Sequence, residues 1–264
     1  MSPKNFMLVV VTLLASSVAL EITLLAGVFS LGDYPYHGIH LTLMGILAGS
    51  QFALYFYGRR HGVKHRLALF FAVGACLTAT GDFVNSAVSQ IEPVSLKLTW
   101  ALLLFGAGYT LYNIALWQHN DGLLRGGSSK FARYRYLIAL PILAINVVSW
   151  FTHVEPNVDG FDLLYYGSFI FNATIYVFLP TFAIWFFYNS GRSVGGLIVL
   201  VGALLIPYSD LILFSSWMRS GDPAVPGFEL YAFNWIVYFG GQALISIFPA
   251  LVIEEELGSA PTRA

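Results

Sequence analysis

The sequence predicts an all-α, polytopic transmembrane helix bundle of about eight spans, and three observations support this fold class. Of its 264 residues, 57% are hydrophobic and only 10% are charged. Soluble domains carry roughly 25% charged residues, so this chain lacks the polar surface that a water-facing body needs. The long apolar runs are continuous and do not alternate as the wall of a β-barrel does. The net charge of −1 also argues against a nucleic-acid partner.

Eight apolar runs are long enough to cross a bilayer, whose hydrocarbon core of about 30 Å requires about 20 residues per helix. We predict that they form a single integral membrane domain covering residues 1–264. The first run stays apolar up to Phe29, beyond the roughly 7–15 residues of a secretory signal core, so we interpret it as a retained helix. The fifth run is the shortest. The runs are 7–30, 38–58, 67–88, 96–117, 136–152, 164–188, 194–217 and 230–253.

The distribution of basic residues sets the predicted orientation. Alternating spans place all of the thirteen Lys and Arg residues except Lys97 and Arg219 on one side of the membrane. By the positive-inside rule that side is the cytoplasm, so both termini are expected to be cytoplasmic. We therefore expect an integral, multi-pass protein, and the compact connections favour a bacterial inner (plasma) membrane.

Three carboxylic acids lie inside predicted spans that run outward from the cytoplasm. Glu21, Asp82 and Asp210 come 14, 15 and 16 residues after the starts of their spans. At about 1.5 Å per residue, each lies about 21–24 Å from the cytoplasmic end. A charge at mid-bilayer costs at least about 2.5 kcal/mol, so intramembrane acids are functional candidates by default. We predict Asp82 and Asp210 as catalytic residues, and for Glu21 a structural role stays equally open.

Polar side chains of other spans could reach the same level and contact a substrate. An isolated Asn, Gln or Tyr in a span is more often a hydrogen-bond partner of a neighbouring helix, so each candidate has that alternative role. Glycines in spans four and eight are interpreted as close-packing positions between helices. The candidate substrate-binding residues are Glu21, Gln51, Tyr109, Tyr112, Asn172, Tyr176, Ser209, Tyr238 and Gln242.

Several other chemistries lack the residues that they need. No Lys lies deep inside a predicted span, which excludes a retinal Schiff base. No span presents His residues at metal-ligand spacing, so we predict no metal site. Cys76 has no His beside it in its span, which makes a thiol nucleophile improbable.

Four motifs around these acids resemble the YhhN-like lysoplasmalogenases. The residues that carry the resemblance are Ala75–Asp82 in span three, Phe105–Tyr112 in span four, Val201–Leu205 with Ser209–Leu211 in span seven, and Tyr238–Ile245 in span eight. The sequence departs from the family at Tyr109, where the family usually has His, and at Asn85 and Ser86, where an apolar stretch is expected. The resemblance implies eight spans and hydrolysis of the vinyl-ether bond of lysoplasmalogens, which gives a fatty aldehyde and a glycerophospho-alcohol.

Two carboxyl groups suit this chemistry. Hydrolysis of a vinyl ether requires protonation of a carbon, which gives an oxocarbenium ion, and then capture of that ion by water. A protonated carboxyl and an ionised carboxylate can supply these two steps, as they do in glycosidases. Two acids close together in a low dielectric cannot both ionise easily, so one is expected to stay protonated. Asp82 and Asp210 are therefore expected to act as a dyad without a cofactor, on a membrane lipid or lysolipid.

Two alternatives use the same acids. A lipid or proton-coupled transporter, or a lipid-binding protein, could use them as a proton relay without catalysing a reaction. An aspartyl intramembrane protease ranks last, because Ala79 and Thr80 precede Gly81–Asp82 where a Gly-x-Gly-Asp signature is required.

Overall fold

The computed structural model describes residues 1–63, 65–86, 89–92, 94–125, 130–158, 162–217 and 228–259. Every regular element within these ranges is a helix. The elements are α1 (Pro3–Leu25), α2 (Asp33–His61), α3 (His65–Asn85), α4 (Val94–Arg125), α5 (Lys130–Ser149), the π-helix η1 (Trp150–Val154), α6 (Glu155–Val158), α7 (Asp162–Asn172), the π-helix η2 (Ala173–Phe178), α8 (Leu179–Asn189), α9 (Val194–Trp217), α10 (Phe228–Ile245) and α11 (Phe248–Ser259).

Seven helices in the described ranges are long and apolar enough to cross a membrane, which confirms an all-α bundle of seven to eight spans. α7, η2 and α8 together form one of them, and α10 and α11 together form another. The predicted fifth span corresponds to a shorter apolar stretch, Ala139–Thr152. Residues 87–88, at the end of the predicted third span, lie outside the described ranges. The chain therefore has the architecture of an integral, multi-pass membrane protein.

The helices α1 and α2 begin and end several residues away from the limits of the first two predicted spans, and local backbone chemistry explains the differences. α1 ends at Leu25, before the predicted limit at residue 30, because Gly27 adopts a left-handed conformation with φ of 68° and stops the helix. α2 begins at Asp33, before the predicted residue 38, and an acidic residue in the first turn is favourable there.

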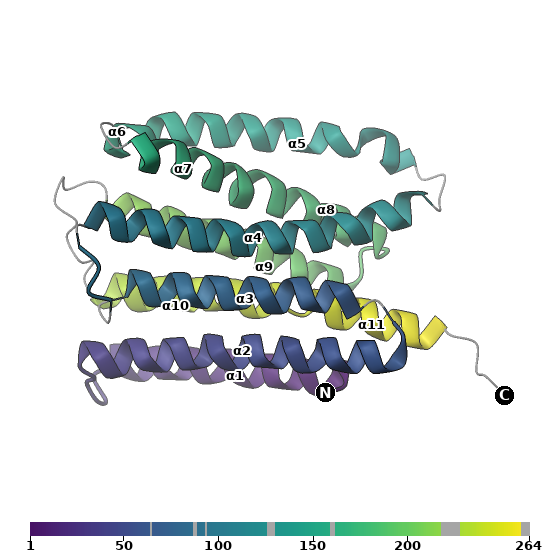
Figure 1. Cartoon of the computed structure of the whole chain (residues 1–264), viewed down its shortest axis with the longest axis horizontal. Helices are drawn as coiled ribbons and strands as arrows, with labels where there is room; N and C mark the ends of the chain where they lie inside the picture. Colours follow the sequence, from purple (N-terminus) through teal and green to yellow (C-terminus); the bar gives the residue numbers. More distant parts are fainter. Residues whose placement is uncertain are drawn as a thin grey trace.

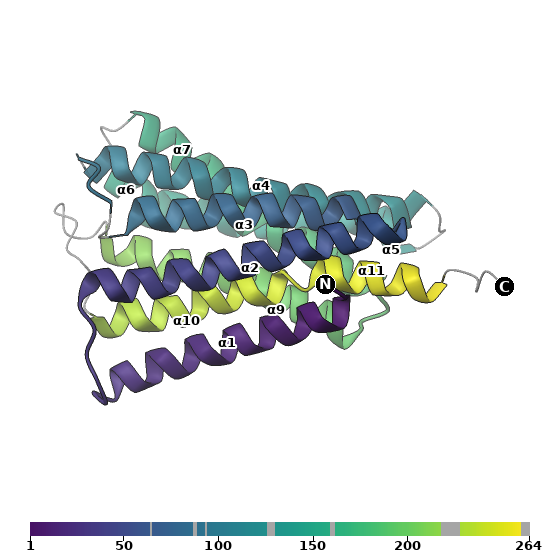
Figure 2. The ribbon, with the colours of Figure 1, turned by 60° about the horizontal axis from the view of Figure 1, so that its bottom comes forward.

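The helices form a bundle in which neighbours in sequence are mostly neighbours in space (Figure 1). α2, α3 and α4 pack side by side, α4 packs against α7 and α8, and α9 packs against α8 and α10. α1 closes the bundle by packing against α2 and α10 (Figure 2). The start of α1 and the end of α11 lie at the same end of the bundle (Figures 1 and 2).

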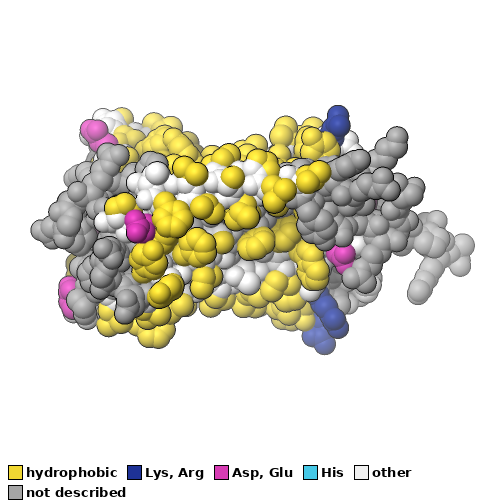
Figure 3. Space-filling view, turned by 90° about the horizontal axis from the view of Figure 1, so that it is seen from above, with side chains coloured by type: hydrophobic (Ala, Val, Ile, Leu, Met, Phe, Trp, Pro, Cys, Tyr) yellow, Lys and Arg dark blue, Asp and Glu magenta, His cyan; other side chains and the backbone are white. Residues whose placement is uncertain are grey.

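The surface fits a membrane environment. Large apolar side chains such as Leu8, Ile145 and Ile170 are more than half exposed. Figure 3 shows hydrophobic side chains over the middle of one face, with the Lys and Arg side chains gathered at the end where α1 begins. Since water would penalise so much exposed apolar area, this surface is suited to contact with lipid.

Two pairs of glycines allow the backbones of neighbouring helices to come into direct contact. A Cβ atom on Gly74 would lie 2.9 Å from the carbonyl oxygen of Gly108, and one on Gly202 would lie 2.9 Å from that of Gly241. These pairs join α3 to α4 and α9 to α10, so Gly108 and Gly241 are close-packing positions as predicted. Gly106 and Gly240 differ, because a Cβ on either would meet only side-chain atoms at 3.7–3.8 Å.

Candidate functional site

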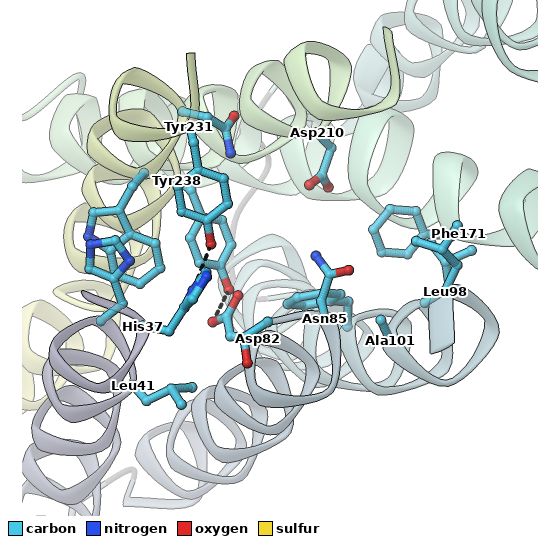
Figure 4. A pocket seen from close by; sticks show the side chains of 16 residues that line it. His37, Leu41, Asp82, Asn85, Leu98, Ala101, Phe171, Asp210, Tyr231 and Tyr238 are labelled. Carbon is cyan, nitrogen blue, oxygen red and sulfur yellow. Dashed lines mark hydrogen bonds between the residues drawn. The ribbon is translucent and has the colours of Figure 1, made fainter. Parts of the chain in front are cut away.

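Asp82 and Asp210 line one cavity inside the bundle (Figure 4). They come from α3 and α9, which are far apart in the sequence. The cavity has about 60 Å³ of space for water centres, and since about 10–15 Å³ holds one water, it has room for several. The residues that line it are His37, His40, Leu41, Asp82, Asn85, Ser86, Leu98, Ala101, Leu102, Phe105, Phe171, Asp210, Tyr231, Asn234, Trp235 and Tyr238.

The cavity has a polar wall and an apolar wall. The polar wall comes from α2 and α10, where the Tyr231 hydroxyl and Nδ1 of His37 lie 3.2 Å apart. The apolar wall comes from α4 and α7, and includes Leu98, Ala101 and Phe171. Figure 4 shows the two carboxyl groups between these walls, with Asn85 beside them. A bound molecule would therefore meet polar groups at one end, acids in the middle and hydrocarbon at the other end.

Asp82 is held in place by its neighbours on α10 and α4. The Tyr238 hydroxyl donates a hydrogen bond of 2.9 Å to Oδ2 of Asp82. The preceding Gly81 lets α4 approach, since a Cβ there would lie 3.0 Å from the ring of Phe105. The small residue before the acid thus brings an apolar wall residue close to the carboxyl group.

Asp210 lies on a helix that continues through a proline. α9 is helical across Pro207, whose missing N–H leaves the carbonyl of Ala203 without its usual helical donor. Among the described residues, Oδ2 of Asp210 is buried and has no hydrogen-bond partner. Because this oxygen forms no hydrogen bond with a described residue, its lone pair or its proton is available to a molecule in the cavity.

A second group of predicted residues forms a hydrogen-bond chain next to the cavity. Nε2 of Gln242 donates to the Tyr109 hydroxyl at 2.9 Å, and the Tyr112 hydroxyl donates to Oε1 of Gln242 at 3.1 Å. All three side chains are fully buried, and they are not among the described residues that line the cavity. Since these hydrogen bonds join α4 to α10, the three residues support the walls of the cavity.

Glu21 lies outside the cavity and reaches it through a histidine. Oε1 of Glu21 is 2.7 Å from Nε2 of His40, and Oε2 accepts a hydrogen bond of 2.8 Å from the Tyr36 hydroxyl. His40 lines the cavity and stacks on Trp235 with ring centroids 3.7 Å apart. The Trp235 indole in turn donates to Ser17 at 3.1 Å. Glu21 and Trp235 thus fix the orientation of the His40 ring, and Tyr36 and Ser17 hold those two side chains in turn.

Sequence reasoning missed His40, His37 and Tyr231 as residues of this site. A signal was present, because Tyr36 and His40 are four residues apart and so share a helix face. Tyr36 and His40 lie in the first turns of α2, and a short connection joins α2 to α1, which carries Glu21. The three side chains are therefore at a similar depth in the membrane.

The remaining predicted residues are not among the described residues that line the cavity. Gln51 donates a hydrogen bond of 2.7 Å to the carbonyl of Ser246, at the break between α10 and α11. Ser246 lies between the end of α10 at Ile245 and the start of α11 at Phe248, so Gln51 satisfies a backbone carbonyl at a helix break. Asn172 and Ser209 are buried in the bundle, and Tyr176 lies in η2.

Replacing Glu21 by Gln should destabilise the protein more than replacing Tyr36 by Phe. Gln offers one acceptor oxygen where Glu offers two, so the Glu21 substitution loses one of the two bonds and weakens the other. The Tyr36 substitution loses one bond and leaves the bond with His40 in place, and each bond contributes about 0.5–3 kcal/mol. Thermal unfolding in detergent measures the difference. Equal melting temperatures for wild type and Glu21→Gln would show that the pair with His40 does not stabilise the fold.

Comparisons with known proteins identify no relative. No family model matches the chain, no curated protein matches it, and no solved structure matches the fold. The cavity and the residues that form it are therefore the evidence that bears on function.

Proposed function

We propose that the protein hydrolyses the vinyl-ether bond of lysoplasmalogen-type lysophospholipids, with Asp82 and Asp210 as an acid/base dyad. The observation that carries this proposal is the meeting of two carboxyl groups from distant spans in one cavity with a polar and an apolar wall. The motif resemblance to YhhN-like lysoplasmalogenases supports the same activity. A single-chain lipid has the polarity pattern of this cavity, with a head group, a reactive bond and a hydrocarbon chain in series.

The proposed reaction consumes one water, and the proton that the dyad lends to the substrate is returned at the end. A protonated carboxyl of the dyad gives its proton to the outer carbon of the vinyl ether, and the carbon bonded to oxygen becomes an oxocarbenium centre. The other carboxylate takes a proton from a water as its oxygen bonds to that centre. The resulting hemiacetal then breaks its bond to the glycerol oxygen, which takes the proton that the second carboxyl gained from water. The hemiacetal hydroxyl gives its proton to the first carboxylate and becomes the carbonyl of a fatty aldehyde, so the dyad returns to its starting state. The two acids share these roles as a coupled pair.

The proposed orientation places both termini in the cytoplasm and the cavity in the outer half of the membrane. Arg59 and Arg60 lie in the last turn of α2, and Arg192 lies between α8 and α9, all at the end of the bundle where α1 begins. A concentration of basic residues at one end is typical of the cytoplasmic side. Asp82 lies in the last turn of α3, close to the opposite end. We propose a bacterial inner membrane as the location.

The purified protein in lipid nanodiscs should release fatty aldehyde from a defined lysoplasmalogen. Mass spectrometry of the products measures the aldehyde and the glycerophospho-alcohol in equal amounts. The matched control substrate is the saturated alkyl-ether lysolipid, which has no double bond to protonate and should stay intact. Aldehyde release no faster than in empty nanodiscs would contradict the proposal.

A second candidate function, transport coupled to protons, is favoured by one observation. The Glu21–His40 pair is buried in the span region and adjoins the cavity, although the hydrolysis steps above do not require it. Buried ionisable pairs in membrane proteins often carry protons. If liposomes containing the protein moved protons or labelled lysolipid and formed no aldehyde, transport would replace hydrolysis as the function.

A further inference from the structure

A groove between α4 and α7 adjoins the cavity that holds the two acids. Leu102 and Phe171 line both spaces, so these two side chains form the wall between them. The groove has a volume of about 320 Å³. Its lining residues are Thr99, Leu102, Leu103, Gly106, Ala107, Thr110, Leu163, Gly167, Ile170, Phe171 and Thr174.

The groove runs lengthwise along both helices. On α4 the lining residues extend from Thr99 to Thr110 at steps of three or four, and on α7 and η2 they extend from Leu163 to Thr174 in the same way. Eleven steps at about 1.5 Å give a length of about 16 Å. The hydrocarbon core of a bilayer is about 30 Å thick, so one leaflet accounts for about 15 Å. The length of the groove therefore matches the depth of one leaflet.

The walls of the groove are apolar despite their threonines. The hydroxyls of Thr110 and Thr174 donate to the carbonyls of Gly106 and Ile170 in their own helices, at 2.7 and 2.9 Å. Ile170 is 67% exposed and so borders the membrane. A Cβ on Gly167 would meet no atom within 4 Å, which shows that the missing side chain leaves open space. These described wall residues offer dispersion contacts, and the hydroxyls of Thr110 and Thr174 are already bonded within their helices.

We propose that this groove holds the hydrocarbon chain of a single-chain lipid. This inference rests on the proposed function and specifies how its substrate binds. The chain lies along α4 and α7 within one leaflet, and the bond to be cleaved passes Phe171 to reach Asp82 and Asp210. The head group lies toward the polar wall formed by His37 and its neighbours. Since that opposite wall presents His37 and Tyr231, it does not suit the second hydrocarbon chain of a diacyl lipid.

A photoreactive lysolipid tests this assignment directly. The probe is a lysoplasmalogen with a diazirine in the middle of its chain, bound to the full-length protein in nanodiscs and irradiated. Mass spectrometry of the peptides then locates the label. We expect label on the groove-lining segments of α4 and α7, and we expect excess unlabelled lysoplasmalogen to displace it.

A blocking variant and a matched control sharpen the test. Gly167→Leu places a side chain in the groove and should lower the displaceable label about tenfold, since the added side chain occupies space that the hydrocarbon chain would fill. Gly45→Leu is the control, because Gly45 is exposed on α2 and a Cβ there also meets no atom within 4 Å. The control should label as wild type does.

The outcomes separate this inference from the proposed reaction. Displaceable label spread evenly over all lipid-facing helices, or unchanged by Gly167→Leu, would overturn the groove assignment even if the protein released aldehyde. Displaceable label confined to the groove, without aldehyde release, would support the chain site and contradict the hydrolysis.

Discussion

Replacing Asp210 by Asn should lower the rate of lysoplasmalogen hydrolysis by about 10²–10⁴-fold, the usual contribution of a positioned acid or base. Asn has almost the same shape as Asp but cannot exchange a proton with the substrate or with water. Since the two carboxyl groups act as one unit, Asp82→Asn should cost a similar factor. The double variant should be little slower than either single one, because residues that act together are not additive. The measurement is kcat/KM for aldehyde release.

A matched substitution elsewhere controls for the loss of a carboxylate as such. Asp33 starts α2, is exposed and is not among the described residues that line the cavity, so Asp33→Asn should keep wild-type activity. Thermal unfolding of each variant separates lost chemistry from lost structure. Wild-type rates in both folded cavity variants, Asp82→Asn and Asp210→Asn, would rule out the dyad.

Replacing Gly202 by Ala should destabilise the protein by about 3 kcal/mol or more, at the upper end of overpacking costs. The added Cβ would lie 2.5 Å from the backbone nitrogen of Ile245 and 2.9 Å from the carbonyl oxygen of Gly241. These are backbone atoms, so no side-chain rotation relieves the overlap and α9 must move away from α10. Because α9 carries Asp210 and α10 carries Tyr238, activity should fall along with stability. Thermal unfolding and the yield of monodisperse protein measure the effect.

Gly240→Ala is the matched control for this second prediction. Gly240 is next to Gly241 on α10, but the nearest atoms to a Cβ there are side-chain carbons of Leu14 and Leu205 at 3.8 Å. The change should therefore be neutral or slightly stabilising, because Ala favours a helix over Gly by up to about 1 kcal/mol. If Gly202→Ala and Gly240→Ala melted at the same temperature, backbone contact between α9 and α10 would not limit stability.

The sequence by itself determined the membrane class and the approximate spans, and it predicted a common depth for the acids. These properties depend only on quantities that add up along the sequence. The hydropathy and length of a run define a span, and the rise per residue sets the depth of each position within it. The ends of helices were less predictable. The end of α1 depends on the left-handed backbone at Gly27, a conformation that hydropathy does not reveal.

Only the tertiary structure decided which polar groups share a space. Asp82 and Asp210 line one cavity because α3 and α9 turn those faces inward, and this rotation depends on close contacts such as that between Gly202 and Gly241. Glu21, at the same predicted depth, faces α2 and acts on the cavity through His40. The physical reason is that the depth of a residue in the membrane depends on its own helix alone. The direction in which its side chain points, and the residues that it meets, depend on how all the helices pack together.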